Sequence, residues 1–319
     1  MTQLVRLEGL TRRFGDLVAV DGISLDLEEG EVLGFLGPNG AGKSTTMKMT
    51  AGFLEPDAGR AIICGHDVVA EPKAARRVLG YLPEGAPAYG EMTPRDFLKF
   101  VAEVRGLSGR RRNEAVAEAA ARAGLDDVMD QTIETLSKGY RRRVGIAQAI
   151  VHDPRVLILD EPTDGLDPNQ KHHVRTLIRD MARHKAIIVS THILEEVEAV
   201  CTRAVIIDRG RIVANGTARE LKATLPTFNS VLIRLSDADA QRAVDVLSAV
   251  PSVAGVQVED RDGGVQTLRA RPGNGGDIAS DVVRALDGAG VRPQSIDVDE
   301  GTLEEVFRRI TTAEEVVHA

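Results

Sequence analysis

Long apolar runs are missing from this chain of 319 residues. The longest, such as residues 32–36 and 156–159, have only the length of a strand. A helix needs about 18 or more apolar residues to span a bilayer, so no membrane-crossing segment is predicted. The first residues mix charges of both signs without an apolar stretch. We therefore expect no secretory signal and a cytoplasmic location.

The chain has only two cysteines, and their spacing does not indicate a functional role. Cys64 and Cys201 lie far apart, with no CxxC pair and no cluster of His or Cys beside them. This spacing does not indicate a metal site. We interpret both cysteines as small, buried apolar side chains.

The chain also lacks an excess of basic residues, since its formal net charge is −8. Non-specific binding to nucleic acid needs clustered Lys and Arg, so no nucleic-acid partner is expected. Two short basic runs do occur, at residues 110–112 and 141–143. The first is predicted to lie in a solvated turn. For the second, two interpretations stay open: added positive charge for phosphates, or the basic face of a surface helix.

A glycine-rich segment between a predicted strand and a predicted helix has the pattern of a phosphate-binding loop. Its glycines let backbone N–H groups turn toward phosphate oxygens, and the following helix directs its positive end at the same anion. Lys43 is expected to hold the β- and γ-phosphates of ATP, and Ser44 to place its hydroxyl on Mg²⁺. The segment comprises Gly37, Pro38, Asn39, Gly40, Ala41, Gly42, Lys43, Ser44 and Thr45.

Two carboxylates follow the apolar residues 156–159, which belong to a strand predicted at residues 156–160 and buried on both faces. Asp160 is expected to organise Mg²⁺, and Glu161 to polarise the attacking water as a general base. The alternative for Glu161 is a turn carboxylate before Pro162. His192 follows the predicted strand at residues 186–190, at the sheet edge where ligands gather.

Residues 136–140 read LSKGY and resemble LSGGQ, the signature of ATP-binding-cassette (ABC) transporters, with Lys138 and Tyr140 as departures. Together with the phosphate loop, the paired carboxylates and His192, this segment makes the chain resemble the nucleotide-binding subunit of such a transporter. Residues 80–84, 136–140 and 302–307 are most similar to drug- and gliding-motility-type exporter ATPases. The core motifs cover roughly residues 1–220.

The resemblance implies roles for further residues. Ser137 and Gly139 would act on the ATP bound by the opposite subunit, which implies a dimer, expected to be a homodimer. His192 would contact the γ-phosphate, and Asp167 would lie in the loop that communicates across the dimer.

Two positions are less typical. Phe14 is expected to stack on adenine, although an aromatic residue near a strand end is often part of a core. Glu84 stands where many relatives have Gln. Its carboxylate is expected to reach Mg²⁺ or water, and its charge to weaken ATP binding or alter coupling to the membrane partner.

The predicted fold class is α/β: a phosphate-loop NTPase domain at residues 1–225, with a helical subdomain at about 85–150. Strands that alternate with helices favour a mainly parallel sheet covered on both faces. Thr93 and Pro94 are predicted to be the N-cap and first residue of a helix. After Pro226, residues 226–319 are predicted to form a small βαββαβ, ferredoxin-like domain. Its last helix carries an apolar stripe that we expect to dock on its own domain.

The predicted function is that of an ATP-binding subunit that hydrolyses ATP as a dimer. It would power export through separate membrane-spanning permease subunits, at the cytoplasmic face of the cell membrane. The alternative is a soluble ABC-type ATPase acting on ribosomes or nucleic acid. Such relatives usually have two cassettes per chain, a long coiled-coil insert or zinc motifs, and none of these is visible here. A regulatory role for residues 226–319, in sensing a small ligand or setting dimer contacts, is compatible with the first function.

Overall fold

The computed structural model describes residues 2–317, with side chains described up to Ile310. The chain divides into two compact units, and the boundary in the sequence lies between Thr217 and Ala218. Among the described residues, no helix has both the length and the apolar character that a membrane span requires.

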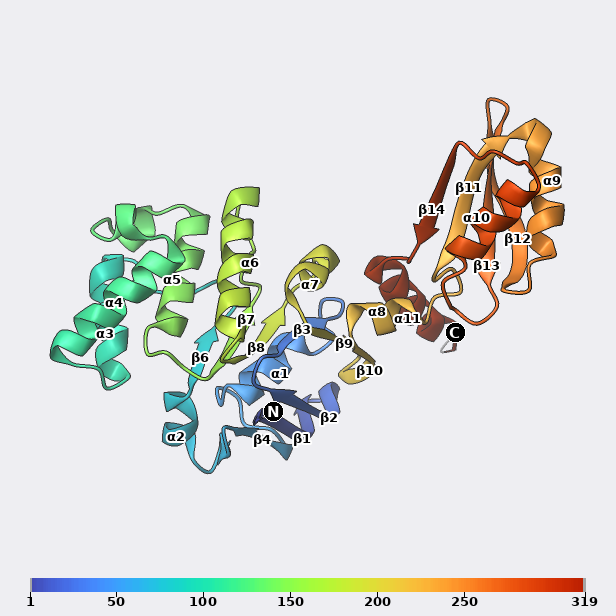
Figure 1. Ribbon diagram of the computed structural model, residues 1–319. Coiled ribbons are helices and arrows are strands. Elements are labelled where there is room, and N and C mark those ends of the chain that lie inside the picture. The colour runs from blue at the N-terminus through green and yellow to red at the C-terminus, as the bar shows by residue number, and fades with distance from the viewer. Residues whose placement is uncertain (1, 318–319) are drawn as a thin grey trace. The chain divides into compact units, whose positions relative to one another are not determined.

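A six-stranded sheet is the centre of the first unit (Figure 1), in the order β10-β9-β3-β8-β7-β6. The neighbours from β9 to β6 pair in parallel, and β10 pairs with β9 in antiparallel orientation. Every residue of β3, β7 and β8 is buried, as expected for parallel strands covered on both faces. The strands are β3 (Val32–Leu36), β6 (Leu79–Leu82), β7 (Val156–Asp160), β8 (Ala186–Ser190), β9 (Arg203–Asp208) and β10 (Arg211–Gly216).

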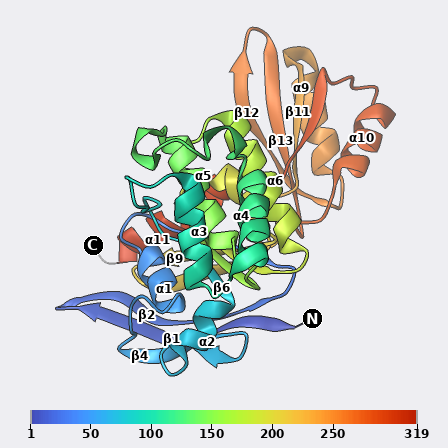
Figure 2. The ribbon, with the colours of Figure 1, turned by 90° about the vertical axis from the view of Figure 1, so that its left-hand side faces the viewer.

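A second, antiparallel sheet in the order β2-β1-β4-β5 forms a separate layer, which the sequence did not predict. Figure 2 shows β1, β2 and β4 as a layer below the helices. Apolar side chains of this sheet and of α1 form one core with the adjoining face of the parallel sheet. The elements are β1 (Gln3–Phe14), β2 (Leu17–Glu28), α1 (Lys43–Thr50), β4 (Ala58–Ile63), β5 (His66–Asp67) and α2 (Pro72–Arg77).

Helices supply a second large core on the other face of the parallel sheet. Thr93 caps α3 by accepting a hydrogen bond from the Asp96 amide, and Pro94 is the first helical residue, which confirms the predicted start. The predicted turn at residues 110–112 is wrong, because α4 begins at Gly109. The elements are α3 (Pro94–Val104), α4 (Gly109–Ala123), η1 (Asp126–Val128), η2 (Ile133–Thr135), α5 (Lys138–Ile150), α6 (Pro168–Ala182) and α7 (Leu194–Val200).

The second unit has the predicted βαββαβ order, with an antiparallel sheet in the order β12-β13-β11-β14. Apolar residues of the sheet, α9 and α10 form its core. The elements are α8 (Ala218–Lys222), β11 (Ser230–Ser236), α9 (Asp237–Ser248), β12 (Val253–Asp262), β13 (Val265–Pro272), α10 (Ala279–Gly288), β14 (Ser295–Asp299) and α11 (Leu303–Val317).

The unit boundary lies before α8, whereas the sequence placed it at Pro226. The reason is that α8 packs against α11 of the second unit. Leu221 of α8 and Leu303 and Val306 of α11 are buried, and Arg309 donates a hydrogen bond to the Thr224 carbonyl at 2.7 Å. The apolar stripe of the last helix therefore docks on α8, which belongs to the same unit but lies outside the residues 226–319 on which docking was expected.

The two cysteines are free thiols, each partly buried against a different core. Cys201 adjoins the helical core, and burial raises the pKa of its thiol to about 12. Burial likewise raises the pKa of Cys64. Both side chains thus behave as apolar packing groups, although neither is fully buried.

His152 is a partly buried histidine in the turn after α5 and should make the free energy of unfolding depend on pH. Its Nε2 donates to the Leu79 carbonyl at 3.0 Å, and within the described chain its Nδ1 has no hydrogen-bond partner. Desolvation, helped by the charge of Arg105, lowers its pKa from 6.5 to about 4.

Between pH 4 and 6.5, His152 is therefore protonated in the unfolded chain and neutral in the folded protein. We expect the free energy of unfolding to be highest above pH 6.5 and to fall by up to about 3 kcal/mol as the pH drops to 4. Urea unfolding of the wild type and His152→Gln across this range tests this, since the variant should show a flatter profile. Identical profiles would contradict the assignment.

Candidate functional site

The phosphate-loop segment connects β3 to α1, as predicted, and two of its glycines are required by close backbone contacts. A Cβ on Gly37 would lie 2.3 Å from the Ile207 carbonyl oxygen of β9. A Cβ on Gly42, whose φ is +102°, would lie 2.3 Å from the Ala19 carbonyl oxygen of β2. The loop is thus held between the two sheets by contacts that only glycine permits.

Lys43 is buried with its ammonium inside this loop. Its Nζ donates to the carbonyls of Gly37 at 2.7 Å and Pro38 at 2.9 Å. Burial lowers the pKa of Lys43, while the carboxylates of Glu161, Asp160 and Glu84 oppose that shift. These three acids are therefore close enough to act electrostatically on the lysine.

The other residues of the loop differ in how far they are exposed to solvent. Asn39 and Gly40 are exposed and Ala41 is buried, while Ser44 and Thr45 are half-buried in the first turn of α1. The hydroxyl of Ser44 thus lies on the helix that begins at Lys43.

Asp160 ends β7 and is only 2% exposed. Its Oδ1 accepts a hydrogen bond from the Ser190 hydroxyl of β8. Its Oδ2 is buried and has no hydrogen-bond partner within the described chain. An unpartnered buried carboxylate oxygen near Lys43 fits a water bound to Mg²⁺. No three His, Cys, Asp or Glu residues of the described part gather as a ready-made metal site, so Mg²⁺ would also need Ser44 and phosphate oxygens.

Glu161 follows directly and has a left-handed backbone, with φ +50°. Such a conformation costs a non-glycine residue about 1–3 kcal/mol and is found mainly at functional sites. Its amide donates to the Ser190 carbonyl at 3.2 Å and to the Ser190 hydroxyl at 3.1 Å. Its Oε1 accepts a hydrogen bond from His192 Nδ1 at 3.1 Å. The pair lies just beyond the C-terminal ends of β7 and β8, and the His192 side chain is 57% exposed.

The signature segment lies at the start of α5. Ser137 is the N-cap, and its Oγ accepts from the Tyr140 amide at 3.3 Å, which leaves the hydroxyl proton for a ligand. Gly139 is buried, and a Cβ there would lie 2.6 Å from Gln170 Oε1. Gln170 forms the capping box of α6 with Asp167. Ser137, Gly139 and Asp167 are therefore grouped, but in the described residues no hydrogen bond or ion pair joins them to the phosphate loop.

Lys138, a departure from the usual signature, is paired rather than free. Its Nζ lies 2.8 Å from Asp164 Oδ2, and this bond lowers the pKa of Asp164. The buried Arg142 lies 3.6 Å from the same oxygen and donates to the Asp160 carbonyl at 3.4 Å. One arginine of residues 141–143 is thus buried, so the run is not simply the basic face of a surface helix. Added positive charge for phosphates stays a prediction.

Glu84 is exposed beside an open cleft of about 650 Å³. Lys48, Lys138 and Arg141 line the same cleft. Phe14 ends β1 with 47% of its surface exposed, and the Arg12 guanidinium lies 5.1 Å from its ring centre. Phe14 is therefore not a core residue, and its ring offers an exposed stacking surface.

Sequence reasoning missed Ser190, Thr163 and Glu196, which belong to or contact the segments that carry Asp160, Glu161 and His192. Ser190 bonds both Asp160 and Glu161. Glu196 accepts from the hydroxyl of Thr163. Glu196 is one acid in a helix that contains several, so only the fold distinguishes it.

Three features together define a phosphate-loop ATPase: a glycine-rich loop before a helix, a buried lysine within that loop, and two carboxylates at the end of another strand of the same parallel sheet. The family described as ABC transporter matches residues 20–164. The daunorubicin/doxorubicin resistance ATP-binding protein DrrA of Streptomyces peucetius is 35% identical over 97% of this chain and 93% of its own length. This chain therefore belongs to the ATP-binding proteins of ABC transporters and is an ATPase.

Other relatives agree with this assignment. The probable multidrug ABC transporter ATP-binding protein YbhF of Escherichia coli (strain K12) is 37% identical over 73% of this chain and 41% of its own length. A solved structure titled as the ATP binding subunit of an ABC transporter has a TM-score of 0.64 and 30% identity. It covers 69% of this chain and 92% of that protein. The predicted family, α/β fold class and ATPase activity are confirmed.

Proposed function

We propose that this ATPase works as a dimer that powers export through separate membrane-spanning subunits at the cytoplasmic face of the cell membrane. The observation that supports the chemistry best is the placement of Lys43, His192 and Glu161. They follow the C-terminal ends of β3, β8 and β7, which are consecutive neighbours in the parallel sheet. Ligands of such sheets bind at this edge.

Each residue at this edge then has a distinct task. The loop amides and Lys43 hold the phosphates of ATP, while Ser44 and Asp160 hold Mg²⁺. When bound there, the metal would neutralise charge on the transferred phosphoryl group. Glu161 accepts the proton of the attacking water. His192, whose Nδ1 bonds Glu161, orients that carboxylate and leaves Nε2 toward the γ-phosphate.

The grouping of the signature residues with Asp167 supports the proposed dimer. Ser137 and Gly139 are grouped with Asp167, and within the described part of the chain no hydrogen bond or ion pair joins them to the phosphate loop. We propose that they complete the site of a second copy, with the Ser137 hydroxyl and the Gly139 amide on its γ-phosphate. Phe14 offers its exposed ring to adenine, and Glu84 faces the cleft beside the phosphates.

The names of relatives support export as the process. DrrA, which matches nearly the whole chain, is named a drug resistance ATP-binding protein. A Nod factor export ATP-binding protein of Burkholderia orbicola is 38% identical over 68% of this chain and 72% of its own length. We propose that the membrane partner selects the transported compound.

An apolar groove of about 510 Å³ is the proposed contact with that partner. Phe53 is 71% exposed and Val104 is 69% exposed, and both line the groove with Tyr81. Exposed apolar side chains gathered in this way mark interaction sites. The groove includes the C-terminal end of α3, and closure of the dimer would reach the membrane through this region and residues 84–96. Its basic lining residues are Lys73, Arg76, Arg77 and Arg105.

We expect Phe53→Asp to lower recovery of the membrane-spanning partner by about tenfold or more, because a charge would replace the most exposed apolar side chain of the groove. ATP affinity should not change. Detergent-purified complexes isolated through this chain provide the measurement. Val69→Asp, at an exposed valine that does not line this groove, is the matched control.

Two outcomes would contradict the proposal. If wild-type complexes contain no membrane-spanning protein, export by this chain is wrong. If they contain ribosomes or nucleic acid that survive moderate salt, the soluble ATPase function is correct instead.

A further inference from the structure

Glu196 of α7 is a buried carboxylate with partners on three segments. It is 5% exposed. Its Oε2 accepts hydrogen bonds from the hydroxyls of Thr163 and Thr191, the latter at 3.2 Å. Its Oε1 lies 3.4 Å from Lys171 Nζ and 3.7 Å from the guanidinium of Arg175, both on α6.

The two threonines belong to the two segments that carry the candidate catalytic pair. Thr163 is two residues after Glu161, and Thr191 directly precedes His192. Both threonines are buried. One carboxylate oxygen therefore ties together the segments whose side chains meet at the 3.1 Å contact between Glu161 and His192.

The backbone of Glu161 needs contacts of this kind to hold its conformation. Its left-handed φ of +50° is strained for a glutamate, and such a conformation persists only where surrounding contacts impose it. The next turn is held by the Asp164 amide, which donates to the Glu161 carbonyl at 3.1 Å. The Thr163 hydroxyl then links this turn to Glu196.

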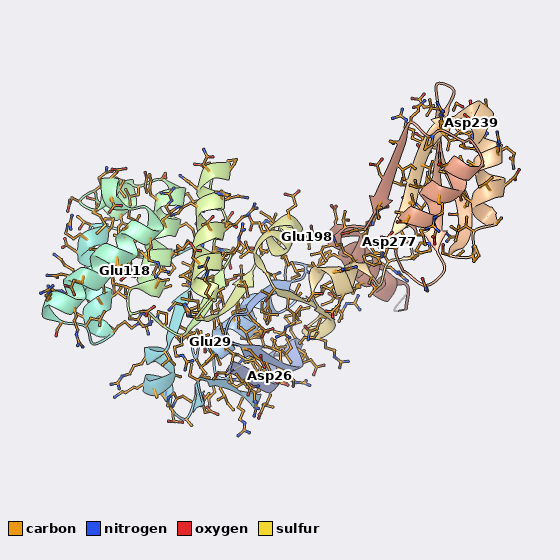
Figure 3. All side chains as sticks on the ribbon, in the orientation of Figure 1. Asp26, Glu29, Glu118, Glu198, Asp239 and Asp277 are labelled. Atoms are coloured by element: carbon orange, nitrogen blue, oxygen red, sulfur yellow. The ribbon has the colours of Figure 1, made fainter. Side chains whose placement is uncertain are left out.

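Packing alone does not explain an acid at this position. Burying a carboxylate carries a large desolvation cost, and an apolar residue of similar size would serve a purely structural core as well. Glu198, two residues further on the same helix, lies on the surface (Figure 3). Of the glutamates of α7, only Glu196 is buried, and it is the one that accepts hydrogen bonds from both threonines.

We propose that Glu196 is a positioning residue for ATP hydrolysis, which holds the Glu161 and His192 segments in register. It acts through Thr163 and Thr191 and does not touch the substrate itself. The inference rests on the roles proposed above for Glu161 and His192.

The test is Glu196→Gln, which keeps the size of the side chain but removes its charge. We expect kcat to fall by about tenfold or more, because small misplacements of catalytic groups are costly. The Kd for ATP should stay within about twofold, since the phosphate loop is unaffected. Thr163→Val should reproduce the loss of kcat, and Thr163→Ser should restore it by returning the hydroxyl. Glu195→Gln, an exposed neighbour with the same change of charge, is the matched control.

Amide hydrogen exchange on the nucleotide-free protein gives a readout independent of activity. In Glu196→Gln, exchange should become faster over residues 161–167 and 190–193 and stay unchanged in β3 and α1. The proposal is overturned if kcat stays within twofold of the wild type, or if kcat, ATP affinity and Tm all fall together. If the wild type itself does not hydrolyse ATP, the proposed function fails, and exchange confined to the two segments would still support positioning.

Discussion

Glu161→Gln should bind ATP as tightly as the wild type and hydrolyse it about 100-fold or more slowly, because the water loses its proton acceptor. Gln keeps the size of the side chain, so the left-handed turn and the neighbouring loops should remain folded. With hydrolysis blocked, dimers that enclose ATP should accumulate. The measurement is Mg²⁺-dependent ATP hydrolysis as a function of protein concentration, with dimer content followed by size-exclusion chromatography.

The wild type provides the complementary result in the same experiment. If two copies complete each site, its activity should rise faster than linearly with concentration. Glu195→Gln should behave like the wild type, because that carboxylate is exposed. Activity that is linear and indifferent to Glu161→Gln would show that the catalytic residue and the paired mechanism are both misassigned.

Gly42→Ala should strongly lower both the stability of the fold and the affinity for ATP. The new methyl group would lie 2.3 Å from the Ala19 carbonyl oxygen, at a φ of +102°. We expect the free energy of unfolding to fall by about 3 kcal/mol or more, because backbone strain and a steric clash combine. ATP affinity should fall at least about tenfold, since the loop amides would be displaced. Urea unfolding and equilibrium ATP binding measure the two effects.

Gly40→Ala is the matched control within the same loop. Its φ is +83°, but a Cβ there would have no atom within 4 Å. We therefore expect a loss of only about 1–2 kcal/mol, from backbone strain alone. Equal losses in the two variants would show that the close approach to Ala19 does not determine the architecture of the loop.

The sequence predicted those elements whose pattern is local. The strands β3, β7 and β8 have the predicted bounds, because each is a short apolar run ending in a polar loop. The N-cap of α3 also follows from adjacent residues, Thr93 and Pro94. The same holds for the candidate site residues that belong to contiguous motifs, such as Lys43.

The features that the sequence did not reveal depend on distant contacts. The separate antiparallel sheet requires β1 to pair with β4, and no turn signal joins those strands. The pairing of Lys138 with Asp164 joins two motifs across 26 positions. Glu196 becomes distinctive only when the fold brings Thr163 and Thr191 to it. Burial and partners of this kind are properties of the assembled structure.

The position of β3 has a consequence for how the protein is made. This strand precedes the phosphate loop, yet its two neighbours in the sheet are β8 and β9. About 150 residues separate it from the first of them, which corresponds to roughly 8–30 s of synthesis at typical ribosomal rates. During that time β3 has no partner strand, and its apolar residues are open to wrong contacts. The nascent chain should therefore depend on chaperones before the site can form, and ATP can stabilise the fold only after most of the first unit has emerged from the ribosome.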